Sequence, residues 1–145
     1  MMSTDGLFVV KFGGASLGSP SLISRAARSV VEVARTGRKI VVVVSAVGRT
    51  TDELLTTAQA ATSQRLPPSQ LDEILSMGER TSARFFAASL SSLGAKAAFL
   101  DPSDPKWPII TNGSHTKAEP IVEACDKAIP SVLGPLMADG IIPVV

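Results

Sequence analysis

The residues KIVVVVS at positions 39–45 decide the fold of this chain. An almost unbroken run of β-branched residues is typical of a central parallel strand, whose two faces must both be covered by helices. A second run, LFVVKF at 7–12, stops abruptly at Gly13-Gly14 and predicts a buried strand that enters a tight loop. The interval between the two runs is long enough for one helix.

Helices are predicted after each of these strands. Ser19 as N-cap and Pro20 at the first helical position begin the first helix, and Gly37 ends it. The second helix begins at Thr50, with Glu53 three positions later completing a capping box. Both segments carry an apolar stripe at helical spacing, which indicates that each packs against other elements.

A helical period returns after a proline-containing connector at 65–69 and continues to Gly78-Glu79, where we expect a break. A further helix then extends to Gly94, which can terminate it. Residues 96–100 are predicted to form a third, short strand.

The last third of the chain is less regular. Residues 101–117 contain three prolines and no sustained period, which predicts a long loop. A short strand is expected at 118–122, confined to a sheet edge or bulge by its proline. A last helix is expected to have Pro130 in its first turn and a kink at Pro135, and residues 141–145 form a final strand.

Strands and helices therefore alternate, which predicts an α/β fold with a parallel or mixed sheet between helical layers. No internal repeat or flexible linker divides the chain. The sequence stops within the apolar run at 141–145, and a strand there would lack the helix that covers it. We therefore expect residues 1–145 to be the N-terminal part of a longer domain, so that the fold is truncated.

Composition narrows the choice of partners and compartment. The chain has 145 residues, with 14 basic and 13 acidic side chains, and its formal charge of +1 disfavours nucleic acid and anionic membranes as partners. Hydrophobic residues make up 45% of the sequence, enough for a substantial core. The single cysteine excludes an internal disulfide, and no apolar run is long enough to span a bilayer. We expect a cytoplasmic protein.

The first segment whose residues could take part in a reaction is the end of the strand at 7–12. Backbone N–H groups exposed by Gly13-Gly14 can close around phosphate oxygens, and Lys11 can neutralise charge on a phosphoryl group in transfer. The segment is not a Walker A loop, because Ser19-Pro20 stands where Lys-Ser/Thr is required. A plain tight turn with an exposed lysine explains the same residues.

A second candidate follows the strand at 39–45, at the position where open α/β sheets bind ligands. The hydroxyls of Ser45 and Thr51 can hydrogen-bond a small polar ligand. Capping of the following helix is an equally simple explanation for this polar stretch. A third candidate is Glu79, whose carboxylate beside Gly78 suits a ligand ammonium group but also suits the first turn of a helix.

Taken together and in order, these segments carry a resemblance. KFGG at 11–14, SAVGRTTDEL at 45–54, LSMGERTSA at 75–83 and ADGIIPVV at 138–145 closely resemble the aspartate kinase branch of the amino acid kinase family. That resemblance implies a three-layer αβα sandwich with a mainly parallel sheet. It also implies transfer of the ATP γ-phosphoryl group to the side-chain carboxylate of L-aspartate, giving 4-phospho-L-aspartate, the first step towards lysine, threonine and methionine.

The resemblance assigns roles to individual residues. It implies that Lys11 is the catalytic lysine, and that ATP is the cofactor, with a Mg²⁺ ion held mostly by phosphate and water oxygens rather than by protein side chains. It further implies a homodimer or larger homo-oligomer. The residues expected to contact phosphates are Lys11, Gly13 and Gly14, and those expected to bind aspartate are Ser45, Thr51 and Glu79.

Two departures from the family pattern bear on activity. Ala15 stands where the family usually has Thr or Ser, and the segments that follow IPVV in the family, including the adenine site and the regulatory ACT domains, are absent. We therefore expect little kinase activity from the isolated chain. The alternatives are another amino acid kinase with a carboxylate acceptor and a non-catalytic binding or assembly module.

Overall fold

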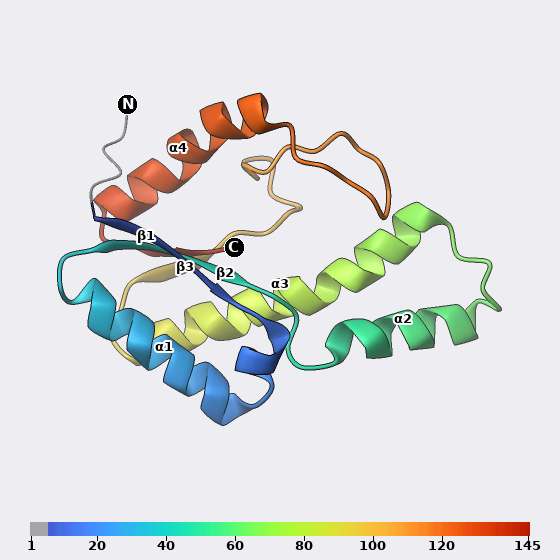
Figure 1. The fold of residues 1–145 in the computed structure, drawn as a ribbon, viewed down its shortest axis with the longest axis horizontal. Coiled ribbons are helices and arrows are strands. Elements are labelled where there is room, and N and C mark those ends of the chain that lie inside the picture. The colour runs from blue at the N-terminus through green and yellow to red at the C-terminus, as the bar shows by residue number, and fades with distance from the viewer. Residues whose placement is uncertain (1–5) are drawn as a thin grey trace.

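The computed structural model describes residues 6–145 (Figure 1). Helices and strands follow one another as β1 (Leu7–Phe12), the 3₁₀ helix η1 (Gly14–Leu17), α1 (Pro20–Ala34), β2 (Lys39–Val44), α2 (Thr50–Ala61), α3 (Pro68–Ser92), β3 (Ala97–Phe99), α4 (Val122–Ala138) and β4 (Ile142–Val144).

The strands form one four-stranded sheet in the order β1-β2-β4-β3, and every pair in it is parallel. This confirms the predicted α/β class. The register pairs Leu7 with Lys39 and Phe12 with Val44, so β1 and β2 begin and end together. In a parallel sheet all carboxyl ends lie at the same edge, which is where the loops after β1 and β2 meet.

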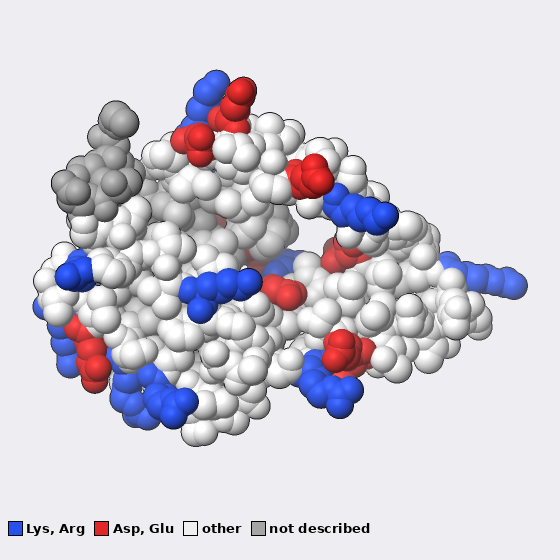
Figure 2. Space-filling view, viewed as in Figure 1, with Lys and Arg blue, Asp and Glu red and all other residues white. Residues whose placement is uncertain are grey.

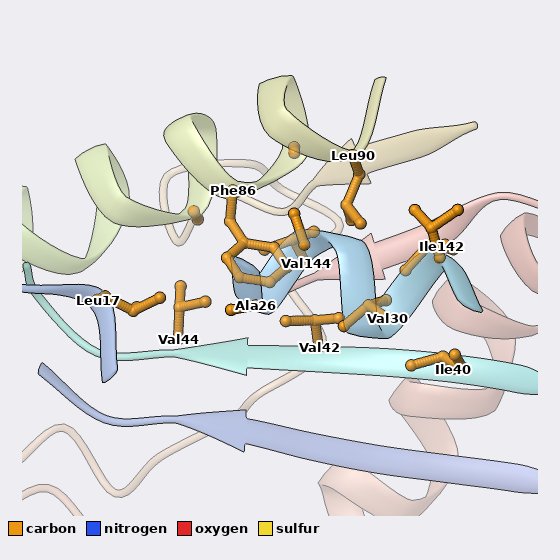
Figure 3. Close-up of a cluster of buried hydrophobic side chains, with 14 residues drawn as sticks. Leu17, Ala26, Val30, Ile40, Val42, Val44, Phe86, Leu90, Ile142 and Val144 are labelled. Atoms are coloured by element: carbon orange, nitrogen blue, oxygen red, sulfur yellow. The ribbon is translucent and has the colours of Figure 1, made fainter. Parts of the chain in front are cut away.

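Helices cover both faces of the sheet, which gives the αβα layers. On one face α1 and α3 pack against alternate residues of the central strands, and Figure 3 shows Phe86 and Leu90 of α3 directed toward Val42 and Val144. The ring of Phe86 also stacks on that of Phe12 in β1, with 5.1 Å between ring centroids. On the other face α4 covers a smaller apolar cluster. The two-sided burial of β2 is what its β-branched run predicts.

β1 is less buried than its apolar sequence indicates, and the prediction of a buried strand is wrong for it. The strand order places β1 at an edge of the sheet, and α4 packs against β4 rather than across β1. Val9 therefore remains 66% exposed and Phe8 39% exposed. Strand order is a tertiary property, so the run at 7–12 alone does not reveal it.

The expected break at Gly78-Glu79 is also wrong, because α3 runs without interruption from Pro68 to Ser92. Gly78 is buried in the middle of the helix. A Cβ atom there would lie 2.8 Å from the Cβ of Ala46, closer than two carbon atoms can pack. Gly78 is therefore required by the contact between α3 and the loop after β2, and it does not end the helix.

α2 begins at Thr50 as predicted, but without the capping box. The N-cap residue is Arg49, and no side chain caps the helix. The Thr50 hydroxyl instead donates a hydrogen bond to the Val47 carbonyl, 2.7 Å away. By contrast, Ser19 caps α1 as expected, since its Oγ accepts a hydrogen bond from the Leu22 N–H.

The C-terminal helix α4 starts at Val122, earlier than predicted, so Pro130 and Pro135 both lie inside it. Each proline lacks the N–H that would bond to the carbonyl four residues earlier, at Asp126 and Ser131. All four of these residues are exposed, so water can satisfy the freed carbonyl groups. A helix interior on the solvent side therefore tolerates both prolines.

The loop before α4 contains no strand at 118–122, contrary to the prediction. Only an isolated antiparallel bridge joins Thr111 to Pro120, and residues 101–117 are otherwise irregular as expected. The short strands predicted at 96–100 and 141–145 are confirmed as β3 and β4. Among residues 6–145, no helix combines the length and apolarity needed to cross a membrane.

Candidate functional site

The candidate site lies at the carboxyl edge of the sheet, where β1 and β2 end side by side. The Ser45 N–H donates to the Phe12 carbonyl over 3.0 Å, which extends the pairing of the strands into the loops that follow. Figure 2 shows that the molecule is hollowed between its main body, the α2–α3 hairpin and the 101–121 loop, with acidic and basic side chains at the margin of the hollow. This edge is the usual ligand position in open α/β sheets.

Lys11 is the last residue but one of β1. Its backbone neighbours Val10 and Phe12 pack into the core below α1 and α3, so Lys11 points from the opposite face of the strand. The side chain is exposed, and no carboxylate of residues 6–145 lies within ion-pair distance of it. Lys11 is thus a cation at the carboxyl edge of the sheet that has no ion-pair partner in 6–145.

The loop after β1 packs directly on the loop after β2. The Gly48 N–H donates to the Gly14 carbonyl over 3.2 Å. A Cβ atom on Gly14 would lie 3.1 Å from the carbonyl oxygens of Ala46 and Gly48, so the two backbones approach as closely as they do only because Gly14 has no side chain. Gly13 has open space beside it, where a ligand can approach the backbone.

Ser45 and Thr51 flank the second loop. Ser45 follows β2 directly and Thr51 lies in the first turn of α2, and both are half-buried. The hydroxyl of the neighbouring Thr50 donates to the Val47 carbonyl within its own turn. The Thr51 hydroxyl takes no part in that hydrogen bond. The structure places both predicted hydroxyl groups at the same edge as Lys11.

α3 approaches this edge through Gly78, which packs on Ala46. Glu79, the next residue, is exposed in the middle of α3 and has no cation within ion-pair distance among residues 6–145. Ala46 therefore contacts both Gly14 and Gly78. The three segments that the sequence indicated, distant along the chain, come together around this one residue.

We expect Gly78→Ala to destabilise the protein by about 1–3 kcal/mol, because its methyl group would collide with the Ala46 side chain between two fixed backbones. Urea unfolding followed by circular dichroism measures the free energy. The matched control is Gly13→Ala, since a Cβ atom there meets nothing within 4 Å and its φ of −78° suits alanine. Equal stability of the two variants would contradict the close packing at Gly78.

Sequence reasoning missed an ion-pair network beside Glu79. Asp101, which follows β3 by two residues, pairs with both Arg80 and Arg84 of α3. Hydrogen bonds from the Ser103 backbone N–H, the Arg84 side chain, the Ser103 hydroxyl and Arg80 hold the pKa of Asp101 well below its usual range. The arginines are four residues apart on one helix face, a spacing that favours a shared acidic partner, but nothing in the sequence indicates which acid.

The 101–121 loop is held at two further points that the sequence did not predict. Both oxygens of Asp72 accept from the Thr116 N–H, and one lies 3.0 Å from His115 Nδ1. Near the middle of the loop, the Ile110 N–H donates to Cys125 Sγ of α4 over 3.2 Å. Hydrogen bonds therefore join the loop to the N-terminal part of α3 and to α4.

Side chains that could ligate a metal do not gather in the described part of the chain. No group of three or more His, Cys, Asp or Glu residues in 6–145 has a suitable arrangement.

Comparison with known proteins yields one family. The sequence profile of the amino acid kinase family matches residues 6–145. The aspartokinase of Mycolicibacterium smegmatis is 41% identical over 113 residues, which are 78% of this chain and 26% of that protein. The chain thus spans about a quarter of the length of the curated relatives it matches.

Solved structures agree on the fold. Aspartate kinase from Synechocystis superposes with a TM-score of 0.73 at 26% identity, covering 96% of this chain and 21% of that one. Aspartokinase III of E. coli in complex with aspartate and ADP superposes with a TM-score of 0.80 at 21% identity, covering 95% of this chain and 40% of that one.

Proposed function

This chain belongs to the amino acid kinase family, and on that premise we propose that it forms the acceptor-binding and phosphoryl-facing part of an aspartate kinase. The observation that carries the proposal is the meeting of the KFGG, SAVG and MGE segments around Ala46 at the carboxyl edge of the sheet. The identity of 41% to a mycobacterial aspartokinase supports this choice within the family.

The proposed reaction transfers the γ-phosphoryl group of ATP to the side-chain carboxylate of L-aspartate. That carboxylate is already a nucleophile at neutral pH, so no general base is needed, and positioning with charge neutralisation suffices. Lys11 neutralises the negative charge that develops on the transferring group. The backbone N–H groups of Gly13 and Gly14 bind the phosphates.

The acceptor is held on the other side of the hollow. In the proposal the Glu79 carboxylate binds the ammonium group of aspartate through charge-assisted hydrogen bonds. The hydroxyls of Ser45 and Thr51 hydrogen-bond the acceptor and orient its carboxylate toward the phosphoryl group. Mg²⁺ bound to the ATP phosphates would offset their charge.

The wider setting is also a proposal. Since the 113 matched residues cover only 26% of the M. smegmatis aspartokinase, we propose that residues 1–145 are the N-terminal part of a longer kinase domain in a cytoplasmic homo-oligomer that serves lysine, threonine and methionine synthesis. Neither nucleic acid nor membrane is a partner in this proposal. The isolated chain then lacks the adenine contacts and has little activity of its own.

The experiment that tests this function is an ADP-release assay on the protein encoded by the complete gene, with ATP, Mg²⁺ and a panel of acceptors. L-Aspartate is expected to be phosphorylated, with trapping of the acyl phosphate by hydroxylamine as a second readout. Preference for glutamate or N-acetylglutamate would point to another carboxylate kinase, and no transfer to any acceptor would favour a non-catalytic module. The isolated chain serves as the comparison, and strong aspartate-dependent ADP release from it would contradict the partial-domain proposal.

A further inference from the structure

Asp101 is the centre of the most extensive side-chain network in the described structure. Arg80 holds it with two nitrogens, since Nε and Nη2 each donate to Oδ2 over 3.2 Å and Nη2 also lies 3.0 Å from Oδ1. The guanidinium of Arg84 pairs with the same carboxylate. The Ser103 N–H and hydroxyl donate to Oδ1 over 2.9 and 2.7 Å. Every lone-pair direction of Asp101 therefore has a donor.

The network is sheltered from solvent and remains charged. The side chain of Asp101 is 12% exposed and that of Arg80 21% exposed, so the ion pair is weakly screened. The donors around Asp101 lower its pKa, which keeps the carboxylate anionic throughout the neutral range. Its single negative charge faces two cations, so the local positive excess would rise from one charge to two if Asp101 were neutral.

Glu79 lies immediately before Arg80 in α3, yet the two side chains are not paired. Neighbouring helical residues point in directions about 100° apart, and they meet only when a long side chain bends round the helix. Arg80 is long enough to bend in this way. Its pairing with Asp101 holds it at the end of β3 instead, while Glu79 stays exposed and without a cation in residues 6–145.

We propose that Asp101 is a positioning residue that holds Arg80 and Arg84 away from Glu79, so that the Glu79 carboxylate stays available for the ammonium group of the acceptor. This inference rests on the proposed function. Arg84 is restrained further, since Nη1 donates to the Arg80 carbonyl and its guanidinium lies 4.4 Å above the Phe99 ring. Arg80 is therefore the cation that Asp101 chiefly controls.

The test is steady-state kinetics on the protein encoded by the complete gene. In Asp101→Asn, the freed Arg80 competes with the acceptor for Glu79, and KM for L-aspartate is expected to rise about tenfold while kcat changes less than about twofold. Adding Arg80→Gln to this variant removes the competing cation and is expected to bring KM back to within about threefold of the original value. Arg80→Gln alone leaves Asp101 paired with Arg84 and should keep KM unchanged.

If Asp101 had a purely structural role, adding Arg80→Gln to Asp101→Asn would not lower KM for L-aspartate. Either that result or an unchanged KM in Asp101→Asn overturns the inference. Thermal melting identifies any variant that fails to fold, and Asp101→Glu, which keeps the charge, then provides the comparison and should bind aspartate more tightly than Asp101→Asn. Absence of aspartate phosphorylation by the unmodified protein would instead count against the proposed function.

Discussion

Replacing Lys11 with alanine is expected to lower kcat for phosphoryl transfer to aspartate by about a thousandfold. Lys11 is an exposed cation at the carboxyl end of β1 with no carboxylate partner in residues 6–145, so its charge is available to the phosphoryl group. Most of the loss should fall on kcat, because the charge that Lys11 neutralises in the proposed reaction is greatest in the transition state. The measurement is ADP release by the protein encoded by the complete gene, at saturating aspartate and ATP.

The matched control is Lys39→Ala. Lys39 is also an exposed strand lysine, but the register pairs it with Leu7, at the opposite end of the sheet from the candidate site. We expect its kcat to remain within about twofold of the original value, because a surface charge so far from the site is screened by salt. A Lys11→Ala variant that retained full kcat would contradict the catalytic role of this lysine, whatever the acceptor.

Neither lysine variant should change stability much. The side chains of both residues are in water, and substitutions at such surface positions usually alter the free energy of unfolding by less than about 0.5 kcal/mol. The edge position of β1 makes this separation possible, since it leaves the Lys11 side chain exposed. A loss of activity without a loss of stability would therefore identify a chemical role.

The strands were the part of the fold that could be predicted best. β1 matches its predicted range and β2 differs by one residue, because runs of β-branched residues bounded by glycine or polar residues leave little choice of secondary structure. Their exposure could not be predicted in the same way. Val9 and Val42 belong to equally apolar runs, but only the strand order decides that one is exposed and the other buried.

Glycine and proline caused the main errors in the helices. The sequence predicts a helix break at Gly78, yet this residue lies inside α3 where the Ala46 side chain packs against it. The sequence also predicts Pro130 in a first turn, although α4 begins eight residues earlier. Both residues lower helix propensity by a local mechanism. Tertiary packing at Gly78 and solvation around Pro130 outweigh that local cost, and neither is visible in a single sequence.

The part of the candidate site that depends on the parallel direction of the strands could be predicted. Parallel strands bring the segments after β1 and β2 to one edge, so the proximity of Gly14 and Gly48 follows from the predicted fold. The approach of α3 to this edge depends on the packing of Gly78 against Ala46, and the Asp101 network depends on where β3 ends beside α3. These contacts join residues far apart in sequence and depend on side-chain packing, so the sequence alone does not predict them.

Replacing Glu79 with glutamine is expected to lower kcat/KM for L-aspartate about a hundredfold, mainly through a higher KM. Glutamine keeps the shape and the helix propensity of glutamate but loses the charge that pairs with an ammonium group. The position is exposed and Glu79 has no ion-pair partner among residues 6–145, so stability should not change. Kinetics with varied aspartate at saturating ATP measures the effect.

Two comparisons make this prediction specific to the ammonium group. Glu73→Gln removes another exposed carboxylate from α3 and should leave kcat/KM within about twofold, since it lies outside the contacts at Ala46. Succinate has the same two carboxylates as aspartate but no ammonium group. With succinate as a poor acceptor, Glu79→Gln should be no slower than the original protein, because there is no positive charge for Glu79 to bind. An equal loss with both acceptors would show that Glu79 acts on some other group of the substrate or on the phosphoryl transfer itself.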